Sequence, residues 1–492
     1  MAAKSAIGPG KIIKLVAGAG SAFVVGQFVW GSERFYGEVF MPIVQRYVDA
    51  ETAHRWAIKM ASYGLMPRFG DNHREYSALK CEFLGLQLKN PIGIAAGFDK
   101  NGEAIKRIGE QWIGFCGNRF RYTPASTLEI QNLVCFGWSK IGYGFNSDGV
   151  GIVSERVKKN HVPGVGVPLG VNLGKNAITE SAALDYEIGC NYFANHCEYL
   201  VINVSSPNTK GLRALQSKDE LVKLLETAHR GLDRIVQDKK PRPKVLVKIT
   251  ADLSPNEKRD IAQVVTNANN KVDGLIISNT TIERTDLKSE FKSEQGGLSG
   301  APLKDASTKC ISDMYKLTDG RVPIIGCGGI ESGADAYKKI CAGASVVQFY
   351  TALVYQGFPA IGRIKRELNE ELLKHGCTTV SAAIGSDHKN RLEDALKEGQ
   401  RSWWKFWLFE NESTNLRRKI CHASGSFMVK EISTSVLLFK RASPYIFPLI
   451  CGSIIFFDWF HTYQLKQGKK ESILDKLVSP EDKKLLEERA KF

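Results

Sequence analysis

Short apolar runs alternate with helical stretches through the middle of this 492-residue chain, from Cys81 to about Gly376. The runs are rich in β-branched residues, and an alternation of this kind predicts an α/β fold with a parallel sheet. About seven runs within about 300 residues favour a closed (β/α)₈ (TIM) barrel over an open sheet. The predicted strands are Pro91–Ala95, Val167–Val171, Tyr199–Val204, Val245–Ile249, Gly274–Ser278, Val322–Ile325 and Ser345–Phe349. Two of the predicted helices between them are Lys218–Val236 and Asn256–Asn269.

Glycine and polar residues follow the predicted strands. In a barrel the carboxyl ends of the strands open on one face, where active sites lie. The segments Gly326–Gly329 and Tyr350-Thr351 end the last two strands, a position at which barrels commonly bind phosphate. Lys248 ends an apolar strand, and a lysine there is costly to bury unless it meets a negative charge. These residues predict a phosphorylated ligand at the strand ends.

The segment Asn203–Thr209 is a more specific motif. Asn203 and Asn208 bracket two serines and a rigid proline turn. Asparagine side chains both donate and accept hydrogen bonds, so such a pair can recognise a cyclic, imide-like ring. The same residue types also favour helix caps and turns, and the motif alone leaves both interpretations open.

Residues 1–32 are predicted to be a mitochondrial targeting segment and transmembrane anchor. Lys4, Lys11 and Lys14 precede or open an apolar stretch that ends at Trp30, and no acidic residue occurs before Glu33. A basic start without acidic residues is typical of a mitochondrial presequence, and the stretch has about the 20 residues that a bilayer requires. The alternative interpretation is a cleaved secretory signal.

The segments that flank the predicted barrel also have recognisable patterns. Residues 33–72 are predicted to form two amphipathic helices, punctuated by Pro42 and Pro67. They are either a simple linker or a lid that lies on a membrane. Residues 391–492 form an extra C-terminal segment whose apolar stretch, Tyr445–Phe457, is a candidate second membrane segment, although it is short and contains Pro448.

Composition narrows the kinds of partner. The formal net charge of +15 suits an anionic membrane surface, a nucleic acid or a phosphorylated ligand. The chain has no long basic block, so no nucleic-acid partner is expected. Its 11 cysteines include no C-x-x-C pair, so no metal site is expected. Their odd number and wide spacing fit a reducing compartment.

Several motifs occur in a fixed order along the predicted barrel: Ala95–Lys100, Asn172-Leu173-Gly174, Asn203–Thr209, Lys248, Ser278-Asn279-Thr280, Gly297–Gly300, Gly328-Gly329 and Tyr350-Thr351. Together they resemble the dihydroorotate dehydrogenases, specifically the quinone-dependent, mitochondrial class 2. The resemblance extends from about Glu33 to about Lys389. Ser206 stands where the soluble relatives have cysteine, and the N-terminal span and helical pair resemble additions of the membrane class.

The resemblance implies an activity and a location. The expected enzyme is an FMN-dependent oxidoreductase that oxidises (S)-dihydroorotate to orotate, with ubiquinone as the final electron acceptor, in pyrimidine (UMP) biosynthesis. The expected layout is an anchor at 1–32, a helical quinone-access lid at 33–72 and an FMN-binding barrel at 73–390. The expected location is the inner mitochondrial membrane, whose lipids would be partners together with dihydroorotate and ubiquinone.

The resemblance also implies roles for individual residues. Ser206 would be the general base, Thr209 a member of its proton relay, and Lys248 would stabilise charge that develops on the flavin. The residues implied for FMN are Ala95, Ala96, Gly97, Asn172, Asn203, Lys248, Ser278, Gly300, Gly328, Gly329, Tyr350 and Thr351. Those implied for the substrate are Lys100, Tyr143, Gly144, Phe145, Asn203, Asn208, Asn279 and Thr280. Those implied for the quinone path are Gln45, His54 and Tyr350.

Residues 115–142 depart from the family pattern. The stretch lacks the family's FMN-contacting serine, its quinone-tunnel arginine and its substrate-binding asparagine before Tyr143. Codons can be chosen for this stretch that, shifted by one nucleotide, encode two of the missing motifs, so a shifted reading frame is one hypothesis. The alternative function is therefore a catalytically impaired membrane protein of the same fold. A different FMN-dependent barrel oxidoreductase is a third hypothesis, against which the Asn203–Thr209 motif argues.

Overall fold

The computed structural model describes residues 9–67, 71–112, 128–129, 148–164, 167–175, 181–205, 212–235, 242–284 and 296–389. The chain divides into two compact units, one made of residues 1–26 and 412–492 and the other of Gln27–Asn411. The described part of the first unit belongs to helix α1 (Pro9–Trp30). Within the described residues, no helix is both long and apolar enough to cross a membrane. The predicted anchor at 1–32 therefore rests on the sequence of that segment.

A curled parallel sheet forms the centre of the second unit. Its strand order is β3-β10-β9-β8-β7-β6-β5-β4, and each hydrogen-bonded pair is parallel. The strands are β3 (Ile92–Ile94), β4 (Leu128–Glu129), β5 (Leu169–Leu173), β6 (Tyr199–Asn203), β7 (Lys244–Ile249), β8 (Gly274–Ile277), β9 (Ile324–Cys327) and β10 (Val346–Phe349). A separate antiparallel hairpin joins β1 (Cys81–Phe83) to β2 (Leu86–Leu88).

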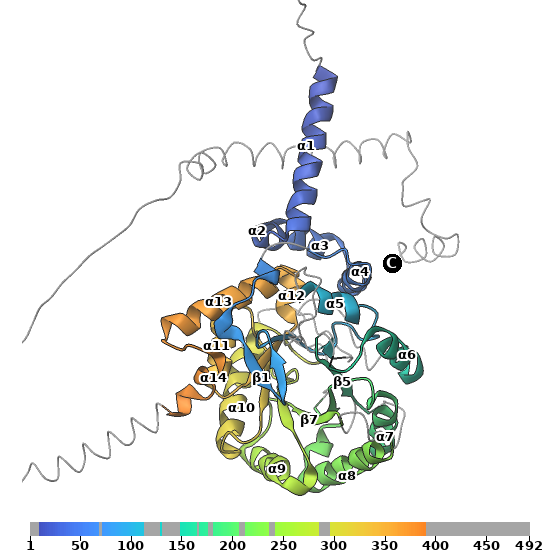
Figure 1. Cartoon of the computed structure of the whole chain (residues 1–492), viewed down its shortest axis with the longest axis vertical. Helices are drawn as coiled ribbons and strands as arrows, with labels where there is room; N and C mark the ends of the chain where they lie inside the picture. The colour runs from blue at the N-terminus through green and yellow to red at the C-terminus, as the bar shows by residue number, and fades with distance from the viewer. Residues whose placement is uncertain are drawn as a thin grey trace, which may run out of the picture. The chain divides into compact units, whose positions relative to one another are not determined.

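Helices alternate with these strands and cover the outside of the sheet, as Figure 1 shows for α8, α9 and α10. They are α5 (Ile105–Trp112), α6 (Val150–Asn160), α7 (Ala182–Phe193), α8 (Lys218–Ile235), α9 (Pro255–Thr266), α10 (Lys304–Leu317), α11 (Gly333–Cys341), α12 (Thr351–Gln356), α13 (Ala360–Lys374) and α14 (Val380–Ala383). Leu221, Leu224, Leu225, Ala228 and Leu232 on α8 are buried, the helical spacing expected of a core-facing stripe. The unit thus has a TIM-like α/β fold.

Most predicted strands match the structure, but two lie later in the chain. Val167–Val171 was expected where β5 spans Leu169–Leu173, and Val322–Ile325 where β9 spans Ile324–Cys327. Strands covered on both faces show no alternation of apolar and polar residues. The sequence therefore does not define the residues at which these strands begin and end, which depend on hydrogen bonding to the neighbouring strands.

The predicted helical pair at 33–72 is present. It consists of α2 (Glu33–Phe35), a π-helical segment η1 (Tyr36–Phe40), α3 (Met41–Tyr47) and α4 (Ala50–Ser62). Asp49 caps α4 by accepting a hydrogen bond of 3.0 Å from the Thr52 N–H. The punctuation predicted at Pro42 falls at the boundary between η1 and α3. Pro42 lies in the first turn of α3, where a helix tolerates the missing N–H.

Helix α13 fastens both ends of the lid segment, 33–72, to the barrel. The buried ammonium of Lys365 donates to the carbonyls of Asn72 and Arg74. The Asn72 side chain donates to the Phe358 carbonyl at 3.2 Å and accepts from the Gly362 N–H at 2.7 Å. A Cβ at Gly362 would lie 2.5 Å from the Asn72 nitrogen, so a glycine is needed at this contact. Arg366 adds an ion pair to Glu33 at the start of the lid.

Candidate functional site

A small polar cavity of about 70 Å³ lies at the carboxyl ends of β3 and β7–β10. It brings together these residues predicted from the sequence: Ala95, Ala96, Lys248, Ser278, Asn279, Thr280, Gly300, Gly328, Gly329, Tyr350 and Thr351. Ser299 and Cys327, which lie within the predicted glycine motifs, also line it, and so do Leu303, Ile330 and Phe349, which the sequence did not single out as site residues. Both groups come from segments far apart in the chain, which the parallel sheet places at one edge.

The two glycines after β9 hold the backbone in a form that other residues resist. Gly328 and Gly329 have φ values of +115° and +70°, a region that L side chains rarely adopt. A Cβ at Gly329 would also lie 2.5 Å from the Cα of Lys304. The Ser307 hydroxyl supports the turn by donating to the Cys327 carbonyl at 2.5 Å. The backbone of Gly328 and Gly329 therefore lies directly at the cavity, with no side chain between them.

A buried lysine lies behind this turn. The ammonium of Lys339 donates to the Lys304 carbonyl at 3.2 Å, to Ser307 Oγ at 3.0 Å and to Thr308 Oγ1 at 2.9 Å. Burial lowers the pKa of Lys339 to about 8. At neutral pH it therefore keeps most of its positive charge, which favours an anionic group at the turn.

Lys248 and Ser278 supply polar groups at the inner wall of the cavity. Lys248 is next to last in β7, and only 5% of it is exposed. The Ser278 hydroxyl, directly after β8, is buried without a hydrogen-bond partner among the described residues. A buried hydroxyl without a partner is costly, so both side chains suit a polar, negatively charged ligand.

Three amide and hydroxyl side chains form a network at the ends of β6 and β8. Asn203 Oδ1 accepts from the Ser205 backbone N–H at 3.1 Å and from the Ser205 hydroxyl at 2.9 Å. Asn279 Nδ2 donates to Ser205 Oγ at 3.0 Å. Asn279 Oδ1 in turn accepts from the Thr280 N–H at 2.8 Å. The network fixes the orientation of both asparagine amides beside the cavity, although Asn203 itself does not line it.

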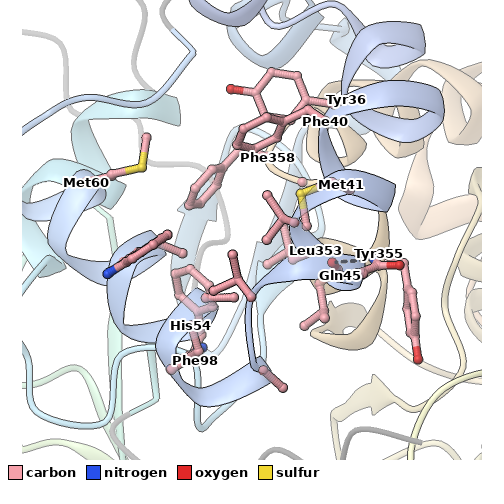
Figure 2. Close-up of a pocket in the computed structure, with 18 of the residues that line it drawn as sticks. Tyr36, Phe40, Met41, Gln45, His54, Met60, Phe98, Leu353, Tyr355 and Phe358 are labelled. Carbon is pink, nitrogen blue, oxygen red and sulfur yellow. Dashed lines mark hydrogen bonds between the residues drawn. The ribbon is translucent and has the colours of Figure 1, made fainter. Parts of the chain in front are cut away.

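A second, larger cavity of about 820 Å³ lies beneath the lid helices (Figure 2). Its lining is mostly apolar and comes from Phe28, from the lid, from Phe98 and from residues 353–355, 357 and 358. Figure 2 shows Tyr36, Phe40 and Met60 from the lid around the same space as Leu353 and Phe358 from the barrel. The Gln45 amide donates to the Val354 carbonyl at 3.3 Å and joins the two walls. The cavity suits a lipophilic ligand.

His54 and Tyr350 form the junction between the two cavities. His54 lines the large cavity, Tyr350 lines the small one, and the Tyr350 hydroxyl lies 3.4 Å from His54 Nδ1. The Phe98 ring packs edge-on against both. Burial, with a smaller contribution from the charge of Lys100, lowers the pKa of His54 to about 4. His54 is therefore neutral at physiological pH and can accept a hydrogen bond from Tyr350.

Other predicted site residues lie outside both linings. Gly97 follows β3 with a φ of +102°, and Asn172 is buried within β5. Lys100 lies near His54 and Glu51, and burial lowers its pKa. The sequence missed the role of Asp99, whose buried carboxylate accepts the N–H groups of Glu103 and Ala104 and so fixes this loop. The following predicted residues lie outside the described part of the chain: Tyr143, Gly144, Phe145, Ser206, Asn208 and Thr209.

Comparison with known proteins places this geometry in a family. The family model described as dihydroorotate dehydrogenase matches residues 141–372. A Mus musculus protein named dihydroorotate dehydrogenase (quinone), mitochondrial, is 43% identical over 395 residues, which are 76% of this chain and 96% of the relative. The chain belongs to the dihydroorotate dehydrogenase family.

Other members of the dihydroorotate dehydrogenase family agree with this assignment. A Lachancea kluyveri protein with the same name as the mouse relative is 36% identical over 430 residues, covering 78% of this chain and 93% of its own. A crystal structure of the Eimeria tenella dihydroorotate dehydrogenase with ferulenol is 39% identical, with a TM-score of 0.61, and covers 70% of this chain and 96% of its own. These relatives support the interpretation of this chain as an active dihydroorotate dehydrogenase. The alternative of a catalytically impaired protein receives no support from them.

The residues that line the small cavity have the chemistry that flavin mononucleotide, the cofactor expected in this family, would require. The backbone at Gly328 and Gly329 suits a phosphate group, because exposed N–H groups bind anions. The hydroxyl of Ser278 suits a polar edge of the flavin ring, and the small side chains Ala95 and Ala96 leave room for a flat ring.

The hypothesis of a shifted reading frame at 115–142 stays a prediction, since the structure describes only Leu128–Glu129 of that stretch.

Proposed function

We propose that this chain oxidises dihydroorotate to orotate with FMN and passes the electrons to a quinone, as a step of pyrimidine biosynthesis. The observation that carries the proposal is the pair of adjoining cavities, one polar and one apolar, that meet at Tyr350 and His54. Such a pair suits two ligands of opposite character that exchange electrons. The names of the Mus musculus and Lachancea kluyveri relatives specify a quinone-dependent, mitochondrial enzyme.

The polar cavity would hold FMN. Gly300, Gly328, Gly329 and Thr351 would hold its phosphate, and Ala95, Ala96, Ser278 and Lys248 would contact its ring, with Gly97, Asn172, Asn203 and Tyr350 as further contacts. FMN, when bound, accepts a hydride from the substrate and releases the electrons to the quinone. The ammonium of Lys248 provides positive charge at the place where negative charge develops.

Residues on the loops after the strands would bind and deprotonate dihydroorotate. Lys100 would hold the carboxylate, and the ring would contact Tyr143, Gly144, Phe145, Asn203, Asn208, Asn279 and Thr280. Ser206 would take the proton from C5, with Thr209 in the relay that removes it. A serine is a weak base at neutral pH, so its position must be held closely.

The large cavity would receive the quinone. Its apolar walls exclude water and favour a lipophilic ring, and Gln45, His54 and Tyr350 supply polar contacts along the path. The lid at 33–72 would face the membrane, from which the quinone enters, and the sheet would close into a complete (β/α)₈ barrel.

The location follows from the same proposal. Residues 1–32 would be a single-pass anchor in the inner mitochondrial membrane, supported by the 22-residue length of α1, which has no acidic residue in its sequence. Sedimentation with lipid vesicles tests the anchor. The full chain should pellet with vesicles, and a chain that lacks 1–32 should stay in the supernatant while retaining dihydroorotate oxidation. Equal sedimentation of the two chains would show that residues 1–32 are not needed for membrane binding and would point to the second candidate segment, Tyr445–Phe457.

The activity is tested with the purified full-length chain. It should carry flavin absorbance that dihydroorotate bleaches without oxygen and that a short-chain quinone restores. Ser206→Ala should keep the flavin and lose most of the bleaching rate, because the predicted flavin contacts lie elsewhere. A chain that binds no flavin, or one whose flavin is not reduced by dihydroorotate, would overturn the proposed function.

A further inference from the structure

A single arginine connects the loops that follow three neighbouring strands. Arg213 lies on the 3₁₀ helix η4 (Leu212–Gln216). Its guanidinium donates through Nε to the Ser205 carbonyl at 3.4 Å, through Nη1 to Asp252 Oδ2 at 2.9 Å and through Nη2 to the Thr280 carbonyl at 3.3 Å. The three acceptors follow β6, β7 and β8 respectively. All three loops open on the face that carries the cofactor cavity.

Asp252 extends the connection. Its other oxygen, Oδ1, accepts from the Thr281 hydroxyl at 2.5 Å, and Oδ2 also accepts from the Ile282 N–H at 3.1 Å. Thr281 pairs through its backbone with Leu298, with hydrogen bonds of 3.1 and 2.7 Å. Leu298 lies two residues before Gly300, which lines the cavity. The pair of Arg213 and Asp252 thus reaches from the loop after β6 to the wall of the cofactor cavity.

The backbone that carries Arg213 is itself held in place. The Gln216 side chain is buried, and it donates to the Arg213 carbonyl at 3.3 Å and accepts from the Thr250 N–H at 3.4 Å. The Arg213 and Asp252 side chains are 23% and 11% exposed, so water weakens this ion pair less than it weakens one at the surface. A fixed guanidinium of this kind presents its donors in a rigid plane, which a lysine ammonium does not.

These contacts surround the side chains that the proposed function assigns to the substrate. Ser205 hydrogen-bonds to Asn203 and Asn279, and Thr280 hydrogen-bonds to Asn279. Ser205 also directly precedes Ser206 in the chain. From these contacts we infer that Arg213, held by Asp252, is a positioning residue for the oxidation of dihydroorotate, because it fixes Ser205 and Thr280, which adjoin the proposed substrate amides and the proposed base in the chain. The inference rests on the proposed function and adds residues that act through others.

The role predicts a loss in one half-reaction only. A misplacement of about 1 Å between reacting groups slows a reaction roughly 100-fold, so Arg213→Ala should slow flavin reduction by dihydroorotate about 10- to 100-fold. Reoxidation by quinone should stay at the wild-type level, because Arg213 does not contact the lid. Flavin content should fall much less than the reduction rate, because Arg213 reaches the cavity wall only indirectly, through Asp252, Thr281 and Leu298. Arg213→Lys should remain slow, since one ammonium cannot reach all three acceptors. Guanidinium ion, added below denaturing concentrations, should partly restore the rate of Arg213→Ala.

The matched control is Arg230→Ala on α8, where an exposed arginine hydrogen-bonds to the side chain of Thr227. Dihydroorotate should reduce the flavin of this variant at the wild-type rate, and added guanidinium should not change that rate. Asp252→Asn should slow reduction, and its effect should not add to that of Arg213→Ala, because the two residues act as a unit. Wild-type reduction by Arg213→Ala, or loss of flavin in parallel with loss of rate, would overturn the inference.

Hydrogen exchange separates this inference from the proposed function. In Arg213→Ala the amides of Ser205 and Ile282 should exchange faster than in the wild type, and those of β10 should not change. Unchanged exchange at Ser205 and Ile282 would overturn the connection itself. A third outcome is faster exchange in Arg213→Ala together with a wild-type chain that does not oxidise dihydroorotate. That outcome would overturn the proposed function, and the connection between the loops would stand.

Discussion

At the scale of single residues, β7 carries two lysines in different surroundings. Lys248 is buried at the cofactor cavity, whereas Lys244 at the other end of the strand forms an ion pair of 3.1 Å with Asp273 and is 46% exposed. Hydrogen bonds to charged groups contribute about 1.5–3 kcal/mol, and exposed ion pairs contribute about 0–1 kcal/mol. The same substitution should therefore have unequal effects at the two positions.

Lys248→Met should weaken FMN binding on the order of tenfold or more and slow flavin reduction, because a negative charge then lacks its counter-charge. Lys244→Met should change neither. The dissociation constant of FMN, titrated by flavin fluorescence against the apoprotein, is the direct measurement. Equal affinities for the two variants would remove Lys248 from the cofactor site.

His54 makes stability depend on pH. Its pKa is about 4 in the folded chain and about 6.5 when unfolded. Between these values the unfolded chain binds a proton that the folded chain does not, so stability is lost as pH falls through this window and is fully present above it. His54→Phe should reduce the loss of unfolding free energy between pH 7 and pH 5 by on the order of 1 kcal/mol. Denaturant unfolding at the two pH values measures it, with the exposed His375→Phe as control, and an unchanged pH dependence would contradict it.

At the scale of elements, the lid and residues within and just after helix α12 form one cavity from two distant parts of the chain. Ala57 on α4 lines this cavity, and Arg55 on the same helix is exposed and does not. A bulky residue in a formed cavity costs about 1–3 kcal/mol, which corresponds to a roughly 5- to 150-fold weaker interaction with a ligand there.

Ala57→Trp should therefore raise the KM for a short-chain quinone about tenfold or more. Reduction of the flavin by dihydroorotate should not change, because the small cavity lies beyond Tyr350. Stopped-flow measurement of the two half-reactions separates these effects, and Arg55→Trp is the control for a tryptophan on the same helix. A slower reduction step, or an unaffected quinone step, would show that the large cavity is not the quinone site.

The elements also show how far the sequence was informative. The run Gly274–Ser278 predicted β8 almost to the residue, because glycine and polar residues flank an apolar run. The same reasoning placed Lys248, Ser278 and Gly328 at one edge of the sheet. It could not find Arg213 or Asp252, because their hydrogen bonds join residues separated by up to 67 positions and no local pattern marks them. Residues 353–355, 357 and 358, which complete the large cavity, were missed for the same reason.

At the scale of the whole molecule, the barrel ends in a short segment that is packed into the fold. The Gly385 N–H donates to the Ile340 carbonyl at 3.0 Å, and His388 Nε2 lies 3.0 Å from the Ala342 carbonyl. The His388 ring stacks on Tyr315 with a centroid distance of 5.0 Å. Helix α14 buries Val380 and Ala383. The family fold therefore needs the chain up to His388.

A chain that ends at Lys389 should bind FMN and oxidise dihydroorotate as the full chain does, because it keeps all of these contacts. The mouse relative supports this expectation, since 96% of its own length matches only 76% of this chain. A chain that ends at Gly376 should lose these contacts together with the two buried apolar side chains of α14. The loss should lower the free energy of unfolding by roughly 2–4 kcal/mol and the Tm by several degrees. Thermal unfolding followed by flavin fluorescence compares the three chains. Loss of flavin from the chain that ends at Lys389 would show that residues 390–492 contribute to the cofactor site, and equal Tm values for the two truncated chains would contradict the role of α14 and His388.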